Sequence, residues 1–184
     1  MPVQKVTREE ILQKAMLVFK RQGYHRTTME DLARACGLLK GSFYHYFSSK
    51  EVLMKEVLRH SNEQNEKILF SLAYAEEKPP QQRLEDLLDA LFNGINRSEG
   101  GCLMGNTTLE TALVTEEFKE PLRVHFNNAM AALAHIYQHT HPREKAQELA
   151  EQATAEIQGS LLLVKLFQNE RLLTDCRNRI LERL

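Results

Sequence analysis

Residues 27–53 of the chain read TTMEDLARACGLLKGSFYHYFSSKEVL. Thr28 and Asp31 have the spacing of a helix-capping pair, and Gly37 stands where a left-handed residue would end that helix. A second short helix follows after two residues, and a longer one begins near the end of the stretch. The pattern therefore predicts a helix-turn-helix.

The second short helix carries an unusual density of polar and aromatic side chains. Phe43 and Phe47 are four residues apart and are expected to face the core, which leaves Tyr44 and His45 pointing outward. Exposed aromatic rings beside Lys and Ser on so short a helix favour a surface that meets a nucleic-acid backbone. The alternative is that the rings belong to the core and the charges to a solvated face.

The stretch resembles the DNA-binding domain of the TetR family of bacterial regulators. That family's pattern runs approximately T-x-x-D-[IL]-A-x-x-A-G-V-S-K-G-[ST]-[FL]-Y-x-[HY]-F-x-[SN]-K-[ED]-x-L, and here it reads TMEDLARACGLLKGSFYHYFSSKEVL. The resemblance implies DNA contacts by Thr28, Lys40, Gly41, Ser42, Tyr44, His45, Tyr46 and Lys50. Lys40, Ser42 and Tyr44 would enter the major groove, and Thr28, His45, Tyr46 and Lys50 would hold phosphates. The chain departs from the pattern at Leu39, where a capping Ser or Thr is usual; a missing cap costs about 1 kcal/mol.

Composition and charge agree with a local nucleic-acid surface on a helical protein. The chain has 184 residues and a net charge of −1, yet residues 1–50 hold nine Lys and Arg against four Asp and Glu, whereas residues 51–184 hold 15 against 21. This distribution predicts a basic head on an acidic body. Three widely spaced cysteines, no signal-like start and no long apolar run predict a cytoplasmic protein without a membrane span.

The helical periodicity predicts an all-α fold of about nine helices. Thr7 and Glu10 cap a first helix that ends before Gly23, and Ser48 with Glu51 is expected to begin a helix that runs from Ser49 to about Tyr74. We expect residues 1–48 to form an N-terminal three-helix DNA-binding domain. Residues 49–184 would form a helical domain for ligand binding and dimerisation.

The second half contains candidate effector contacts. Polar Asn106 and Glu110 follow Cys102 within about two helical turns, and they either orient a ligand or satisfy one another. The stripe Phe126, Met130 and Tyr137 is a core pattern by itself, but in the TetR family it would line a drug-sized pocket. The complete set of expected effector contacts is Phe92, Cys102, Asn106, Glu110, Phe126, Met130, Tyr137 and Phe167. The Gly-Cys-Leu-x-x-Asn segment resembles a subset of the family in which this cysteine lies by the pocket and, in some members, reacts with electrophiles; the alternative is a small buried thiol.

The resemblance also implies partners. The last two helices would pair with their copies in a homodimer, which predicts a palindromic double-stranded DNA operator and release by an unknown small-molecule effector. No cofactor is expected, and His135 with His139 is a weak metal pattern because no carboxylate or thiol completes it. Two other functions stay open: a cysteine-dependent enzyme built on Cys102, and a helical module that binds protein.

Overall fold

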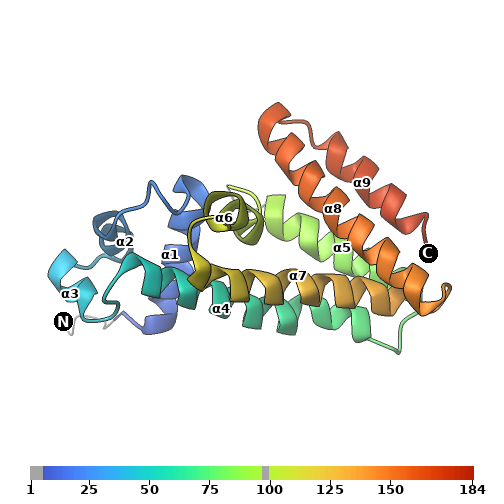
Figure 1. Cartoon of the computed structure of the whole chain (residues 1–184), viewed down its shortest axis with the longest axis horizontal. Helices are drawn as coiled ribbons and strands as arrows, with labels where there is room; N and C mark the ends of the chain where they lie inside the picture. The colour runs from blue at the N-terminus through green and yellow to red at the C-terminus, as the bar shows by residue number, and fades with distance from the viewer. Residues whose placement is uncertain (1–5, 97–99) are drawn as a thin grey trace. The chain divides into compact units, whose positions relative to one another are not determined.

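A computed structural model describes residues 6–96 and 100–184, and within these ranges the fold is all-α, as predicted (Figure 1). The described residues form nine α-helices and one 3-10 helix. Their bounds are α1 (Arg8–Gln22), α2 (Met29–Cys36), α3 (Lys40–Tyr44), α4 (Lys50–Ile68), η1 (Phe70–Tyr74), α5 (Pro80–Asn96), α6 (Leu103–Thr111), α7 (Glu116–Tyr137), α8 (Arg143–Phe167) and α9 (Arg171–Leu181). None of these helices combines the length and the apolar character that crossing a membrane requires.

The chain forms two compact units. The first unit comprises Met1–Ser61 and Leu103–Leu122, and the second comprises Asn62–Cys102 and Arg123–Leu184. Packing therefore groups α6 and the start of α7 with the helix-turn-helix. The boundary that we expect after residue 48 divides the chain by function, into DNA binding and ligand binding, and not by packing. It therefore stays a prediction.

Local capping fixes the helices of the first unit as the sequence indicated. The Glu10 N–H donates to the Thr7 hydroxyl oxygen at 3.2 Å, and the Thr7 N–H donates to the Glu10 carboxylate at 2.8 Å. Thr28 and Asp31 make the same reciprocal pair, both at 3.1 Å. Gly37 ends α2 with φ of +71°, in the left-handed region that glycine adopts without strain.

The core of the first unit is formed by apolar side chains from α1 to α4 and from α6 and α7. Phe43 and Phe47 are buried, as predicted, with their ring centroids 6.1 Å apart. The other members are Ile11, Leu12, Ala15 and Phe19 of α1, Tyr24 of the following loop, Leu32, Ala33 and Cys36 of α2, Leu53, Met54, Val57 and Leu58 of α4, Leu103 and Met104 of α6, and Phe118 and Leu122 of α7. Burying the inner faces of α2 and α3 in this way leaves their outer faces for another partner.

Helix α4 differs from the prediction at both ends. Its first turn is capped by Ser49, whose hydroxyl oxygen accepts from the Val52 N–H at 3.2 Å, so the cap lies one residue later than the predicted Ser48. The helix ends at Ile68, and residues 70–74 form the 3-10 helix η1. The Ser71 hydroxyl donates to the Lys67 carbonyl at 2.7 Å, a side-chain bond that competes with regular helix geometry.

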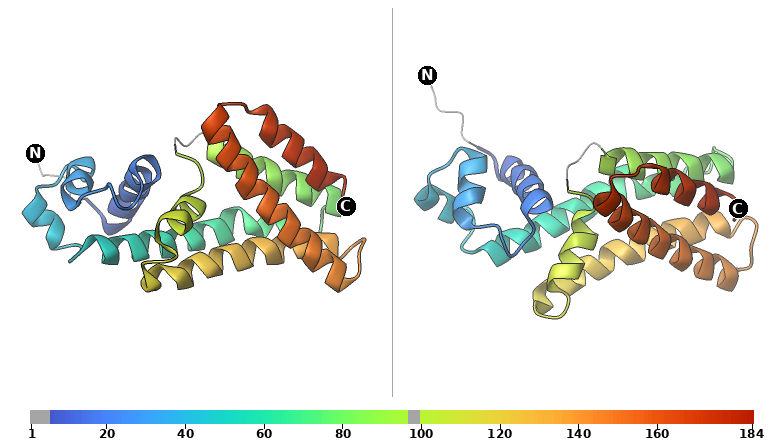
Figure 2. Two further views of the ribbon diagram at one scale, coloured as in Figure 1. Left: turned by 45° about the horizontal axis from the view of Figure 1, so that its top comes forward. Right: turned by 90° about the horizontal axis from the view of Figure 1, so that it is seen from above.

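The second unit is a helical bundle with a continuous apolar core. Helices α8 and α9 lie side by side, and α9 also packs on α5 (Figures 1 and 2). Tyr137 of α7 is fully buried, and its hydroxyl donates to the Ile180 carbonyl of α9 at 3.0 Å. Burial raises the pKa of this phenol to about 12. The bond ties α7 to the last helix, so Tyr137 is a structural residue of the core.

Candidate nucleic-acid interface and effector cavity

The outer face of α3 is polar and exposed. Lys40, Ser42, Tyr44 and His45 are exposed, while Phe43 between them is buried. Because α3 has only five residues, burial of the Phe43 ring fixes the direction in which its other side chains point. Sequence reasoning therefore placed these four residues on the surface correctly; their contacts with DNA remain a prediction.

Two further features concern the start of α3. Leu39 occupies the N-cap position, makes no capping hydrogen bond and is 81% exposed. A Cβ added at Gly41 would meet no atom of the described chain within 4 Å. Packing inside the protein therefore does not require glycine here, which leaves the approach of an outside partner as a reason for it.

Tyr46 and Lys50 are engaged within the first unit. The Tyr46 hydroxyl donates to the Val6 carbonyl at 3.2 Å. The Lys50 ammonium donates to the carbonyls of Tyr24 and Thr27, both at 2.9 Å, and lies 4.4 Å from the Tyr24 ring centroid. Both side chains were predicted to hold phosphates, and the structure gives each of them a role in positioning the loop or the N-terminal segment. The two remaining phosphate candidates, Thr28 at its cap and His45, are exposed.

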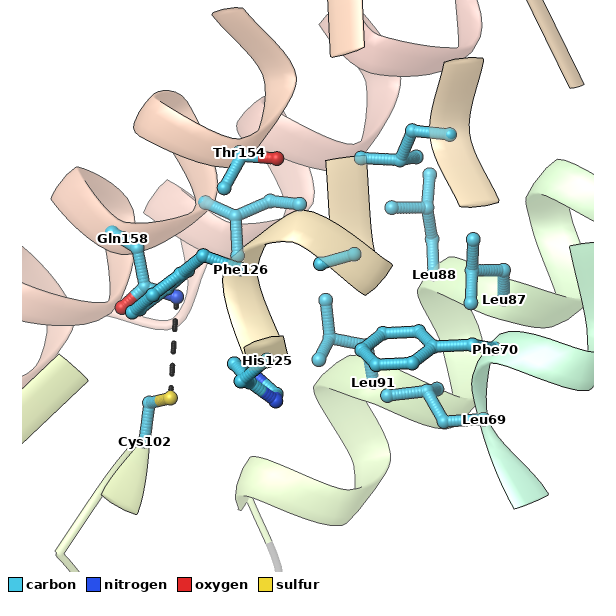
Figure 3. Close-up of a pocket in the computed structure, with 13 residues that line it drawn as sticks. Leu69, Phe70, Leu87, Leu88, Leu91, Cys102, His125, Phe126, Thr154 and Gln158 are labelled. Carbon is cyan, nitrogen blue, oxygen red and sulfur yellow. Dashed lines mark hydrogen bonds between the residues drawn. The ribbon is translucent and has the colours of Figure 1, made fainter. Parts of the chain in front are cut away.

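The second unit contains an apolar cavity (Figure 3). The empty space within it is about 510 Å³ including its opening to solvent, and the centre of a water-sized molecule can occupy about 50 Å³ of it. A cavity of this size suits a small molecule. Its lining residues are Leu69, Phe70, Leu87, Leu88, Leu91, Cys102, His125, Phe126, Ala129, Leu133, Thr154, Ile157 and Gln158.

Two of the eight expected effector contacts, Cys102 and Phe126, line this cavity. The other six lie elsewhere, for identifiable reasons. Phe92 borders a shallower hollow between α5 and α9, Tyr137 belongs to the core, and Phe167 is exposed on α8. Met130 lies on α7 outside the lining. Asn106 and Glu110 belong to the first unit, where the Glu110 carboxylate accepts from the His25 N–H.

The sequence did not single out His125, which lines the cavity and is 8% exposed. Its ring lies 5.6 Å from that of Phe70 and 5.2 Å from that of Phe126, measured between centroids. Burial lowers the pKa of the imidazole to about 4, so the ring is neutral at pH 7. The available signal was a histidine next to Phe126 in a helix of mixed character, which by itself does not distinguish a core residue from a ligand contact.

Cys102, His139 and His141 each have a polar neighbour in the structure. Cys102 is partly buried and lies 4.0 Å from the Gln158 amide nitrogen, a long contact to sulfur (Figure 3). His139 lies 2.8 Å from the Arg83 guanidinium, and His141 bonds to the Arg183 carbonyl at 2.7 Å. Across residues 6–96 and 100–184, no three His, Cys, Asp or Glu side chains are grouped in a way that could hold a metal ion.

An exposed, polar second helix in a helix-turn-helix, together with a helical unit that contains an apolar cavity, defines the class of helix-turn-helix transcriptional regulators. Residues 11–57 match the family described as "Bacterial regulatory proteins, tetR family", and residues 80–179 match "Transcriptional regulator LmrA/YxaF-like, C-terminal domain". The chain belongs to the TetR family of transcriptional regulators.

Individual relatives agree with this assignment. The chain is 28% identical over 167 residues to an uncharacterized HTH-type transcriptional regulator in the lacX 3′ region of Lactococcus lactis subsp. lactis, covering 89% of this chain and 85% of the relative. It is 27% identical over 161 residues to the uncharacterized HTH-type regulator YxaF of Bacillus subtilis (strain 168), covering 85% and 84%.

Solved structures share the fold. A TetR transcriptional regulator from Legionella pneumophila superposes with a TM-score of 0.88 at 22% identity, over 98% of this chain and 97% of that one. The reduced form of Escherichia coli NemR gives a TM-score of 0.79 at 20% identity, over 94% of each chain.

Proposed function

We propose that the protein is a repressor that binds a palindromic operator as a homodimer and leaves it when a small, largely apolar molecule occupies the cavity of the second unit. The observation that carries this proposal is the outer face of α3, whose Lys40, Ser42 and Tyr44 are exposed beside the buried Phe43. A helix held in this way can present its side chains to base edges in the major groove.

The phosphate contacts follow from the surroundings of α3. Thr28 and His45 are exposed and are the direct candidates, while Lys50 and Tyr46 hold the neighbouring backbone in position. Contacts of this kind fix the register of the protein on the duplex, and the base contacts then give sequence preference.

An exposed apolar strip on α8 supports the dimer. Leu162, Leu163, Leu166 and Phe167 are exposed in the single chain, although four large apolar side chains in one turn and a half favour burial. Pairing of α8 and α9 with their copies would cover this strip. Two-fold symmetry then predicts half-sites separated by whole turns of DNA.

An effector can control DNA binding only if its affinity differs between the conformation that fits the operator and the one that does not. A molecule in the cavity weakens DNA binding only if it binds better to the conformation whose heads do not fit the operator. Helices α4 and α7 each begin in the first unit and continue into the second, so each of them connects the two units as one continuous helix.

The test of DNA binding is a titration onto DNA from upstream of the protein's own gene, with nonspecific competitor, at low and at roughly fourfold higher salt. We expect a dissociation constant on the order of 10 nM that weakens steeply with salt. Lys40→Ala should weaken binding, whereas Lys145→Ala, which removes a charge from α8, should not. If random DNA from a selection is also bound only weakly, the head has another partner, such as a protein.

Dimer formation is tested separately by sedimentation. Leu166→Lys on the α8 strip should shift the chain toward monomer, because a charge would be buried in the pair. Leu113→Lys is the matched control, since Leu113 is 99% exposed and lies in the first unit. A wild-type monomer, or a Leu166→Lys variant that remains dimeric, would contradict the assignment of this surface.

A further inference from the structure

His125 is a polar group at a place where the surrounding packing is apolar. Its side chain projects from α7 into the lining of the cavity and stands between Cys102 and Phe70 (Figure 3). The residue is 8% exposed, and no hydrogen-bond partner for Nδ1 lies among the described residues. An unpaired buried polar atom destabilises the folded protein, so its presence calls for a reason.

Packing alone does not supply that reason. The neighbours of the imidazole are the rings of Phe70 and Phe126, at centroid distances of 5.6 and 5.2 Å. A phenylalanine at position 125 would make similar ring contacts without leaving a polar atom unpaired. Nδ1 is sealed from solvent with the ring as it stands, so a ligand reaches it only when the imidazole turns about its Cβ–Cγ bond. A ligand that pairs with this nitrogen in the turned ring would recover the cost, which is how a mostly apolar site fixes the orientation of its ligand.

The rest of the lining limits the charge of that ligand. None of the described residues that line the cavity is Lys, Arg, Asp or Glu. The Thr154 hydroxyl donates to the Ala150 carbonyl at 2.8 Å, so its proton is already used within α8. An ion would therefore lose its hydration without gaining a counter-charge, which is strongly unfavourable.

We propose that His125 is the polar anchor of the effector site and that it selects small, uncharged, ring-containing molecules that carry one hydroxyl group, as phenols do. The proposal rests on the proposed function only in taking this cavity as the effector site. A neutral imidazole has one N–H and one unprotonated nitrogen, so Nδ1 either donates or accepts. A hydroxyl can do both, and it therefore pairs with Nδ1 in either tautomer, whereas an ether or a ketone can only accept.

The burial of the ring supports the preference for uncharged ligands. Because burial lowers the pKa of His125 to about 4, the imidazole carries no charge at pH 7 and offers no ion pair to a carboxylate. Three rings in the lining also give a flat ligand surfaces to pack against. Phe70, His125 and Phe126 supply these rings.

The test uses three probes of matched shape, 4-ethylphenol, ethylbenzene and 4-ethylbenzoate, titrated into the full-length protein at pH 7. Binding is followed by ligand-observed NMR in the absence of DNA. The wild type should bind 4-ethylphenol at least about tenfold more tightly than ethylbenzene, the ratio that one well-placed hydrogen bond of about 1.4 kcal/mol gives. 4-Ethylbenzoate should bind more weakly than either.

The variant His125→Phe separates recognition from packing. It should keep its affinity for ethylbenzene within about threefold, while the preference for the phenol falls to about twofold or less. His60→Phe, a histidine of α4 outside the cavity lining, is the control and should retain the wild-type preference. If His125→Phe proves unfolded, His125→Gln should retain part of the preference, because the amide supplies an accepting oxygen and a donating NH₂ group.

The outcomes are distinct from those of the DNA titration. An unchanged phenol preference in the folded His125 variants, or the absence of any preference in the wild type, would overturn this inference while leaving operator binding untouched. Failure of the wild type to bind any of the three probes would overturn it as well. Loss of operator binding, in contrast, would contradict the proposed function and not the chemistry of the cavity.

Discussion

Glu110 and His25 are joined at two points. The Glu110 carboxylate accepts a hydrogen bond from the His25 backbone N–H at 3.1 Å, and the ring N–H at Nε2 of His25 donates to the Glu110 carbonyl at 3.1 Å. The pair links α6 to the loop between α1 and α2, within the first unit. It fixes the segment from which α2, and through it α3, is positioned.

Removing the carboxylate should loosen that loop. Glu110→Ala deletes one charge-assisted bond, so we expect the His25 amide to exchange its hydrogen about fivefold faster, equivalent to about 1 kcal/mol. Hydrogen exchange with peptide-level resolution measures this. Glu110→Gln keeps an acceptor oxygen and should show a smaller effect, and the exposed Glu120→Ala should show none. Equal exchange in all three variants would mean that the bond does not hold the loop.

Gly23 is required by the same contact. Its φ is +80°, and a Cβ added there would lie 2.6 Å from a carboxylate oxygen of Glu110. Gly23→Ala should therefore lower the free energy of unfolding by at least about 2 kcal/mol, through backbone strain and displacement of Glu110. Gly94→Ala is the matched control. Gly94 lies within α5 with open space around it, so alanine there should stabilise by about 0.5–1 kcal/mol. Chemical denaturation of both variants measures the contrast.

Replacing Leu39 with a capping residue should raise the free energy of unfolding. Leu39→Ser would supply the missing side-chain acceptor at the start of α3, and we expect the free energy of unfolding to rise by about 1 kcal/mol. Leu39→Ala also removes the exposed apolar side chain but provides no cap, so it should bring little of this gain. Denaturant titration distinguishes them, and equal effects of the two substitutions would show that capping is not the cause.

Substitutions of Lys50 and Lys40 should distinguish a loss of stability from a loss of DNA binding. Lys50→Met removes three bonds to loop carbonyls, so the free energy of unfolding should fall by roughly 1.5–3 kcal/mol even without DNA. Lys40→Met, on the exposed face of α3, should leave stability within about 0.5 kcal/mol and weaken DNA binding. If Lys50→Met is as stable as the wild type, the ammonium is available to a phosphate after all.

The stability of the second unit should depend on pH through His125. Its pKa is lowered from 6.5 to about 4, so the unfolded chain binds the proton more tightly. The contribution is fully present above about pH 6.5 and is lost as the pH falls toward 4. Between pH 7 and pH 5 the wild type should lose about 2 kcal/mol more than His125→Phe. Identical losses, measured by denaturation at both pH values, would show that His125 is not titrating from a buried site.

The sequence predicts the first unit better than the second, because the features of the first depend on residues close together in the chain. Capping at Thr7 and Thr28 depends on residues three apart, and the burial of Phe43 and Phe47 depends on residues four apart, so both could be predicted. The end of α4 at Ile68 carries no Pro or Gly in the sequence and depends on tertiary packing.

The cavity depends on which helices face each other, and periodicity does not contain that information. Tyr137 and Phe126 belong to one apolar stripe, yet the first bonds to α9 in the core and the second lines the cavity. Asn106 and Glu110 follow Cys102 closely in sequence, but the division between the units falls between Cys102 and Leu103. His125 differs from a core histidine only in its unpaired nitrogen, which no sequence pattern reveals.

The first unit is assembled from two separate segments of the chain. The ring of Tyr24, which is buried, packs edge-on against that of Phe118 with centroids 5.0 Å apart, although 93 residues separate them along the chain. During synthesis, the helix-turn-helix segment emerges long before Phe118 does. The head therefore cannot complete its packing until a loop containing the intervening residues has closed, an event whose entropy cost slows folding. Until then the edge of Tyr24 that Phe118 covers stays exposed, so completion of the helix-turn-helix packing is coupled in time to the synthesis of α7.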